Sequence, residues 1–319
     1  MTASLPEDVQ AVFDRFITTE YTTVDRRGQP ITWPVTPYYE PGRTAIDVTT
    51  GLGYPKKADD AAANPMVSLL FSDPTGSGLE DPPTVLVQGT AQVDDRDLEH
   101  NRERYTRESA TKLPGAQSIA PPKALQRFFR WYYTRIYVHV RPERVYVWRE
   151  GPDTEPELLD AHMEEVRSGH NEEPPAAHAG PGAATPVWDS RLDELGRRYD
   201  SAVLSLVCPD GFPFSVRTPV EVDPEAHRIR LTDVPPGVPL QAGLACLTAH
   251  DHAPDFTWQR NFQVRGDLVE EDGGWSLRPA RLVGGFELPP TGALDRFRLN
   301  LSKVRRFRRI AKRELAKRR

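Results

Sequence analysis

Two threonines and two lysines lie close together in the sequence and have the side chains needed to bind an anion. Thr49 and Thr50 end a predicted strand, and Lys56 and Lys57 stand near the start of the helix predicted to follow it. Hydroxyl and backbone N–H groups donate hydrogen bonds to an anion, ammonium groups neutralise it, and a helix N-terminus favours negative charge. Taken alone, these residues favour a pair of solvated surface lysines that bind nothing. The alternative is an anion-binding pocket, which the surrounding motifs favour once they are considered together.

No other residues form a recognisable catalytic set. His250 and His252 occupy alternate positions and could face one metal ion, but no third ligand is evident, so we expect polar residues at a strand end and no metal site. Cys208 and Cys246 are expected to be small buried hydrophobic residues. Walker A, GxGxxG and GxSxG motifs are absent from the sequence. Catalytic residues stay unknown at this stage.

The composition excludes several classes of protein. The 319 residues carry 41 Lys+Arg and 46 Asp+Glu, with 38% hydrophobic residues, which suits two globular domains and not a disordered chain. Two cysteines cannot build a disulfide scaffold, and no apolar run is long enough for a spanning helix. The N-terminus does not resemble a signal peptide, so we expect a cytoplasmic protein.

Short β-like segments separated by turn signals dominate the first 150 residues. Predicted strands lie at 20–25, 30–39, 43–50, 66–72, 83–94 and 135–148, and predicted helices at 6–18, 54–64 and 97–132. Six short strands favour a small barrel, because closing the sheet removes its exposed edges. Residues 95–133 are interpreted as a helical insertion into that barrel. Residues 151–186 are rich in Pro, Gly and acidic residues and are predicted to be a linker that includes a short helix.

The second half of the sequence repeats the order of the first. A helix at 189–198 precedes strands near 201–209, 213–223, 228–233, 243–250, 257–270 and 275–288. Five short matches occur in the same order, including Val87-Gln88-Gly89 with Val264-Arg265-Gly266. We therefore predict a mainly β (α+β) fold: two tandem six-stranded split barrels in domains 1–150 and 187–293, forming an intrachain pseudo-dimer with peripheral helices. The alternative is two unrelated β domains with chance matches.

The first half also contains a series of motifs typical of one family. They are Gly28-x-Pro30-x3-Pro34-Val35, Val48-Thr49-Thr50, Gly53-Tyr54-Pro55-Lys56-Lys57-Ala58, Asn64-Pro65-x-Val67-Ser68-Leu69 and Val87-Gln88-Gly89-Thr90. In this order they resemble the flavin-binding split barrels related to pyridoxamine 5′-phosphate oxidase. The resemblance is good over 20–94 and loose over 134–150. It implies a dimeric six-stranded barrel with FMN, or in some branches deazaflavin F420 or haem, at the subunit interface.

The resemblance also implies which residues contact the cofactor. Lys57 precedes a small residue as in the family motif, so it is the first candidate for the flavin phosphate, with Lys56 the second and Thr49 and Thr50 as hydroxyl donors. The flavin ring would face Pro34, Val35, Thr36 and Gln88.

The second copy is degenerate at the same place. Leu240 and Asp233 replace a lysine and a threonine, so we expect one competent site per chain. The second copy would then contribute only a wall, with Trp258, Arg260 and Arg265 as candidates.

The charge of the chain is uneven. Residues 302–319 carry ten Lys/Arg and one Glu, within a predicted basic amphipathic helix over 294–319, and the rest of the chain is acidic. The helix could dock on the acidic body, contact an anionic membrane peripherally, or assist an anionic ligand. The acidic body makes nucleic acid an unlikely partner.

These observations favour an FMN-binding, oxidoreductase-like protein that transfers a hydride or electrons between the flavin and a small organic substrate. FMN is favoured over F420 because no additional basic cluster is evident beside the proposed phosphate site. The alternatives are an F420- or haem-binding split barrel, a non-enzymatic cofactor carrier, or an interaction module. A monomeric pseudo-dimer and a homodimer both remain open.

Overall fold

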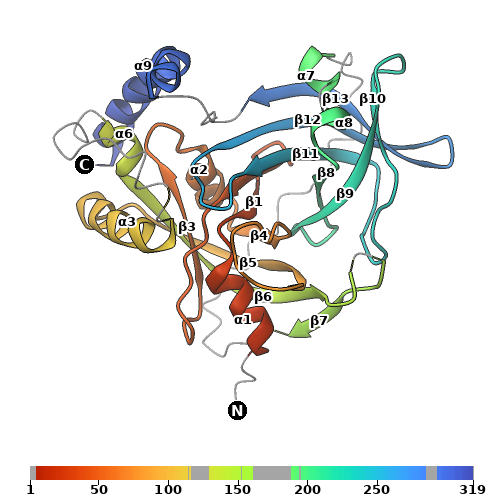
Figure 1. Ribbon diagram of the computed structural model, residues 1–319, viewed down its shortest axis with the longest axis horizontal. Helices are drawn as coiled ribbons and strands as arrows, with labels where there is room; N and C mark the ends of the chain where they lie inside the picture. Colours follow the sequence, from red (N-terminus) through yellow and green to blue (C-terminus); the bar gives the residue numbers. More distant parts are fainter. Residues whose placement is uncertain are drawn as a thin grey trace.

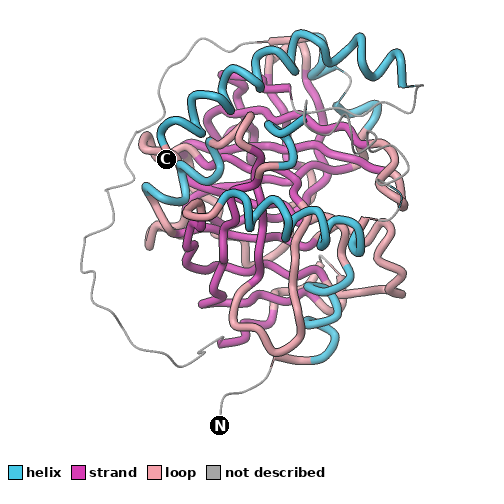
Figure 2. Tube along the Cα trace, turned by 90° about the vertical axis from the view of Figure 1, so that its left-hand side faces the viewer, coloured by secondary structure: helices cyan, strands magenta, loops and turns pink. Residues whose placement is uncertain are grey.

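The computed structural model describes residues 5–113, 115, 129–151, 153–160, 188–193, 195–284 and 293–318. In this part of the chain, strands form the interior and helices cover the outside (Figure 2). The strands form two units, one from each half of the sequence (Figure 1). Each unit has its own apolar core. The mainly β fold with peripheral helices, predicted from the sequence, is confirmed.

The first half forms a seven-stranded sheet with helices around it. Its strands pair in the order β2-β1-β4-β5-β6-β3, and β7 adds to β6. The elements are α1 (Glu7–Arg15), β1 (Thr19–Val24), β2 (Pro30–Val35), β3 (Ile46–Gly51), α2 (Lys56–Ala63), β4 (Met66–Phe71), β5 (Thr84–Asp94), α3 (Leu98–Lys112), α6 (Arg130–Tyr133), β6 (Arg135–Trp148) and β7 (Glu157–Asp160).

The second half forms a closed barrel in the order β10-β13-β12-β11-β8-β9. The elements are α7 (Ser190–Asp193), α8 (Leu195–Arg198), β8 (Ser201–Val207), β9 (Pro213–Asp223), β10 (Arg228–Leu231), β11 (Gly243–His252), β12 (Gln259–Glu271), β13 (Gly274–Gly284) and the long C-terminal helix α9 (Ala293–Lys317).

The two halves share one strand order. If β1 corresponds to β8, β2 to β9 and so on to β6 and β13, every neighbour pair of the first sheet recurs in the barrel. The difference is the extent of closure, because β9 pairs with β10 over four residues, whereas the chain after β2 meets β3 through an isolated bridge between Tyr38 and Asp47. The expectation of two six-stranded units needs one addition. The first unit carries β7 as a seventh strand.

A glycine bends the sheet at the same position in both halves. The register of β5 and β6 shifts between Gln88 and Gly89, and that of β12 and β13 shifts between Arg265 and Gly266. A side chain on either glycine would collide with a backbone carbonyl of the neighbouring strand. Such bulges bend and twist a strand. The sequence match around Gly89 and Gly266 thus has a physical cause, since both positions exclude a Cβ.

Four hydroxyl groups mark the contact between the halves. Thr22 and Thr32 pair across β1 and β2, and Ser205 and Ser215 pair at the corresponding positions of β8 and β9. Their buried oxygens form one cluster, with Thr22 Oγ1 2.9 Å from Ser215 Oγ and Thr32 Oγ1 2.6 Å from Ser205 Oγ. This arrangement relates the two halves by an approximate two-fold axis, so equivalent residues of the halves can be compared directly.

Two predicted helices fall only partly within the described residues. The helix predicted over 97–132 is α3, which ends at Lys112, followed by the short α6; residues 114 and 116–128 lie outside the described part. The predicted linker begins with β7 in place of a helix, because Glu157–Asp160 pairs with β6. The rest of that linker, 161–186, also lies outside the described residues. Among the helices described, none combines the length and apolar character needed to cross a membrane.

Candidate functional site

A cavity of about 570 Å³ lies where the two halves meet. Its first wall comes from β2, the end of β3 and the start of α2, and its second from β12 and β13. Residues of α9, including Arg306 and Phe307, complete the lining. A volume of this size lies within the range of pockets that bind small molecules and cofactors.

Six of the eight predicted cofactor residues line this cavity. They are Pro34, Val35, Thr36, Thr49, Lys56 and Lys57. Thr50 does not line it, because its buried hydroxyl donates a 2.8 Å hydrogen bond to the Tyr54 carbonyl. Successive residues of a strand face opposite sides, so only one of the two threonines can face the cavity.

Gln88 also lies away from the cavity, contrary to the prediction. Its amide donates a 3.0 Å hydrogen bond to the carbonyl of Pro213, and its side chain is fully buried. The approximate two-fold axis explains this position. Gln88 is the equivalent of Arg265, since each residue precedes the bulge glycine of its half, and it is Arg265 that lines the cavity.

The two lysines of the predicted phosphate site differ in their surroundings. Lys56 is half-exposed and its Nζ lies 2.8 Å from Asp60 Oδ1 and 3.7 Å from Asp25 Oδ2. Lys57 is partly buried and lies over the Tyr54 ring, with Nζ 5.4 Å from the ring centroid. Within the described residues, no carboxylate lies at ion-pair distance from Lys57. Burial, together with the nearby Arg135, lowers the pKa of Lys57 to about 8.

Arg135 is a buried cation that the sequence prediction missed. It begins β6, is 6% exposed, and lines the cavity. Its guanidinium donates hydrogen bonds to Tyr105 Oη at 2.6 Å and to Tyr54 Oη at 3.4 Å, and packs over the Tyr132 ring. No carboxylate of the described residues lies at ion-pair distance from it. Lys57 and Arg135 therefore place two cations beside Tyr54 with no negative charge to balance them.

Two buried polar atoms at this end of the cavity lack hydrogen-bond partners. They are Arg135 Nε and the hydroxyl of Tyr38, a residue that is 7% exposed and also lines the cavity. Burial raises the pKa of Tyr38, so its hydroxyl stays neutral and able to donate. Leaving buried polar atoms unpaired costs free energy, which a ligand oxyanion would recover. The residues present thus fit an anionic group.

The second half contributes arginines to the opposite wall. Arg265 and Arg281 line the cavity, whereas Trp258 and Arg260, the other predicted wall residues, do not. Arg260 is paired with Asp251 at 2.7 Å. Burial and the neighbouring Arg281 lower the pKa of Arg265, although the Cys246 thiol opposes this. The expectation that no additional basic cluster adjoins the phosphate site is therefore wrong, since Arg135, Arg265 and Arg281 all line the same cavity.

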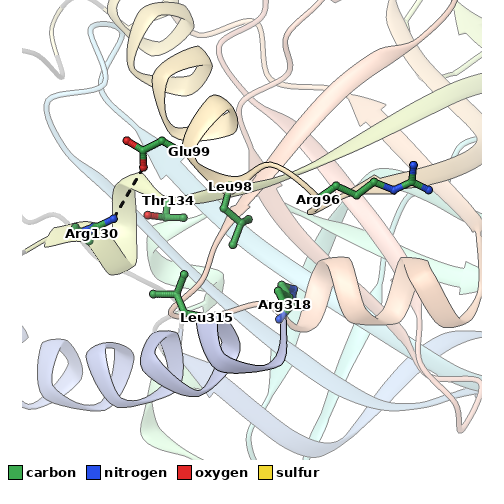
Figure 3. Close-up of a pocket in the computed structure, with 7 residues that line it drawn as sticks. All are labelled: Arg96, Leu98, Glu99, Arg130, Thr134, Leu315 and Arg318. Atoms are coloured by element: carbon green, nitrogen blue, oxygen red, sulfur yellow. Dashed lines mark ion pairs between the residues drawn. The ribbon is translucent and has the colours of Figure 1, made fainter.

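The C-terminal helix docks on the first half through its apolar stripe. The Phe307 ring stacks on Trp131, with centroids 5.1 Å apart, and meets Tyr54 edge-on at 5.5 Å. Near the end of α9, Leu315 and Arg318 face α3 and α6 across a smaller hollow of about 240 Å³ (Figure 3). Arg318 pairs with Asp59 at 2.7 Å and with Asp95 at 2.9 Å. Docking on the body, one of the three expected roles of this helix, is thus observed.

Two aromatic side chains occupy the equivalent position in the other half. Ile31 and Val283 line the cavity, and their register equivalents are Phe214 and Tyr146. These two larger rings meet edge-on with centroids 5.4 Å apart.

His250 and His252 lie at the end of a strand, as expected. Both are buried at the end of β11, where His250 Nε2 lies 2.6 Å from Glu20 Oε1 and His252 Nε2 lies 3.5 Å from Asp73. Arg217 Nη2 lies 2.8 Å from the same Glu20 oxygen. This network connects the two halves and is structural. Among the described residues, no three potential ligands cluster to hold a metal ion.

Comparisons with known proteins find similar solved structures only. No protein-family model and no curated protein sequence matches the chain. General stress protein 26 from Bacillus anthracis is 17% identical to this chain, with a TM-score of 0.32. The match spans 48% of this chain and 96% of that protein. A putative pyridoxamine 5′-phosphate oxidase from Listeria innocua is 13% identical to this chain, with a TM-score of 0.31. The match spans 44% of this chain and 95% of that protein. An FAD-binding protein from Mesorhizobium loti is 18% identical to this chain, with a TM-score of 0.31. The match spans 46% of this chain and 94% of that protein.

Proposed function

We propose that the cavity binds a flavin-type cofactor through its phosphate group and that the protein is an oxidoreductase acting on a small organic substrate. The observation that carries this proposal is the pair of Lys57 and Arg135 beside Tyr54, with no carboxylate partner among the described residues. Two cations in a partly dry cavity cost free energy unless an anion binds there. A phosphate group supplies the required charge.

The walls of the cavity suit a planar ring. Ile31, Pro34, Val283 and Phe307 are apolar, and the amides of the second wall, such as Gln259, can exchange hydrogen bonds with the polar edge of a flavin. When bound, such a ring accepts or donates a hydride. The residues of this chain would hold the ring, orient it and exclude water from one face. No side chain of the cavity stands out as an acid or base, so the catalytic residue is not assigned.

FMN and deazaflavin F420 are the two candidates, because each joins a flavin-type ring to a phosphate group. Haem is less suitable, because none of the described residues lining the cavity is histidine, cysteine or methionine, the side chains that most often ligate haem iron.

We also propose that the two halves arose by internal duplication and that one site was lost. The shared strand order, the equivalent bulge glycines and the paired hydroxyl cluster support this history. A single chain would then form the whole pseudo-dimer and bind one cofactor. Isothermal titration of the monomer with FMN or F420 should give a stoichiometry of one, and a value of two would contradict the loss of the second site.

The proposal is tested by cofactor binding. Purified protein should bind FMN or F420 with an altered absorption spectrum and should bind riboflavin, which lacks the phosphate, more weakly. Lys57→Met should weaken FMN binding at least tenfold, because it removes a charged contact, whereas Lys56→Met should change it less than threefold, because Asp60 already neutralises Lys56. A wild-type chain that bound neither cofactor would contradict the proposal. A bound cofactor that never turned over would indicate a carrier.

A further inference from the structure

The cavity carries more positive charge than one phosphate group neutralises. Its lining includes five cations without a carboxylate at ion-pair distance among the described residues: Lys57, Arg135, Arg265, Arg281 and Arg306. A phosphate monoester carries a charge of about −1.5 to −2 at neutral pH. If it binds between Lys57 and Arg135, as proposed above, three arginines remain unbalanced.

These three arginines come from elements far apart in the sequence. Arg265 lies on β12, Arg281 on β13 and Arg306 on α9. Arg281 and Arg306 are exposed, Arg265 is half-buried and Arg135 is buried, so the three arginines extend from the wall of the cavity to its rim. A charged ligand group that contacts these arginines would therefore belong to a part of the ligand that extends out of the cavity.

Arg306 has a fixed position at this rim. The next residue, Phe307, is held between Trp131 and Tyr54, and Gly53 leaves the space for it, since a Cβ on Gly53 would lie 2.8 Å from Phe307 Cβ. The Arg318 ion pairs hold the end of the helix. The helix therefore presents Arg306 to the cavity, while neighbouring cations such as Arg309 are exposed and do not line it.

Resting on the proposed function, we infer that the cofactor carries a second anionic group beyond its phosphate, and that Arg306 on the C-terminal helix, with Arg265 and Arg281, contacts it. The chemistry fits a carboxylate-bearing extension, which arginine binds in a bidentate geometry. Among flavin-type cofactors, F420 has such an extension after its phosphodiester and FMN has none. The arginine rim is thus a determinant of cofactor specificity.

The test compares two matched pairs of probes on the full-length chain. Riboflavin and FMN differ by a phosphate, and the bare deazaflavin chromophore and F420 differ by the whole phosphodiester and carboxylate tail. Dissociation constants are measured by fluorescence for the wild type and for Arg306→Gln, Arg281→Gln and Arg309→Gln. The last variant removes the same charge from the same helix outside the cavity, and circular dichroism checks that each variant is folded.

We expect Arg306→Gln and Arg281→Gln each to weaken F420 binding about tenfold, with changes below twofold for FMN and for the bare chromophore. Arg309→Gln should leave every value within twofold. Equal changes for FMN and F420, no change for F420, an Arg309→Gln effect as large as that of Arg306→Gln, or binding of FMN alone would overturn the inference and leave the proposed function standing. A wild-type chain that bound none of the four probes would overturn both.

Discussion

Lys56 and Lys57 are neighbours in the chain, yet their charges meet different surroundings. Asp60 and Asp25 balance the ammonium of Lys56, whereas Lys57 lies over Tyr54 near Arg135. Burial and a like charge both disfavour the protonated form of a lysine, and both act on Lys57. Lys57 is therefore the residue whose charge responds to a bound anion.

The lowered pKa of Lys57, about 8, makes a prediction about pH. Because an anion binds the protonated ammonium, the affinity for FMN or F420 should fall as the pH rises through about 8. Fluorescence titrations between pH 6.5 and 9.5 would measure this. Lys57→Met should bind weakly with little pH dependence over that range, and a variant that kept the wild-type pH profile would refute the assignment.

At the residue scale, local sequence pattern predicted cavity residues that come from elements adjacent in the sequence. Thr49 and Lys57 were predicted because a strand and the following helix place them at one end of the sheet, whereas Pro34 was predicted from the family resemblance. Arg135 and Arg306 were missed because elements distant in the sequence bring them to the cavity, and Tyr38 was missed because nothing in the sequence marks its hydroxyl as buried. One signal was available, since Arg135 opens an alternating apolar strand at an inward-facing position, where a charge is unusual.

At the scale of elements, a charged network fixes α3 on the sheet. Asp47 of β3 accepts a hydrogen bond from Arg104 of α3, and His139 Nδ1 of β6 lies 2.6 Å from Asp47 Oδ1. Burial alone would raise the pKa of Asp47, but these two partners hold it below its usual value. The same hydrogen bond raises the pKa of His139. Since α3 carries Tyr105, the network also positions the cavity wall.

We predict that the contribution of His139 to stability depends on pH. Because the pKa of His139 is higher in the folded protein than in the unfolded chain, its contact with Asp47 stabilises the fold fully below about pH 6.5. This stabilisation is lost as the pH rises through the pKa of His139 in the folded protein. His139→Gln should lower the free energy of unfolding by about 1.5–3 kcal/mol at pH 5.5 and by less at pH 8.5. Urea unfolding at both pH values measures this. The exposed His100→Gln is the control, and an equal loss at both pH values would contradict the prediction.

A second prediction concerns the packing contact that holds α9 against the first half. Gly53→Ala would place a methyl group 2.8 Å from Phe307 Cβ and 2.9 Å from Trp131 Cε3, so the helix should be displaced. We expect a loss of about 1–3 kcal/mol, a shift in tryptophan fluorescence and faster tryptic cleavage in the helix. Gly274→Ala, with no atom within 4 Å of its added Cβ, should behave as the wild type. Unchanged cleavage in Gly53→Ala would show that the contact does not hold the helix.

Sequence pattern predicted most of the strands and helices that the structure describes. The strands alternate apolar and polar residues, which leaves a clear period of two, and 135–148 indeed forms one strand. Of the helix predicted over 97–132, the structure describes α3, which ends at Lys112, and the short α6, and both lie within the predicted range. β7 was missed because its four residues depend on pairing with β6 and not on local preference.

At the scale of the whole molecule, buried charges connect the two halves. Glu20 of the first half is 1% exposed at its side chain and accepts hydrogen bonds from Arg217 at 2.8 Å and Ser72 at 2.9 Å, beside His250. Burial alone would raise the pKa of Glu20, but His250 and Arg217 keep it below its usual value. Removing one partner from a buried ion network leaves a charge without compensation.

Arg217→Met should therefore destabilise the protein by about 3–5 kcal/mol. Denaturant unfolding measures the loss, and the matched control is Arg191→Met, which breaks a pair with Asp189 at the surface and should cost at most about 1 kcal/mol. Equal effects of the two variants would show that the network does not hold the halves together.

The difference between Ile31 and Phe214 has a consequence for how the molecule can change. In an assembly of two identical chains, every substitution appears twice, so one position cannot keep a small residue while its mirror position gains a large one. Here both positions belong to one polypeptide and are encoded separately. One half can therefore be redesigned, for instance by reopening the space under Phe214 and Tyr146, while the codons that shape the first pocket stay untouched.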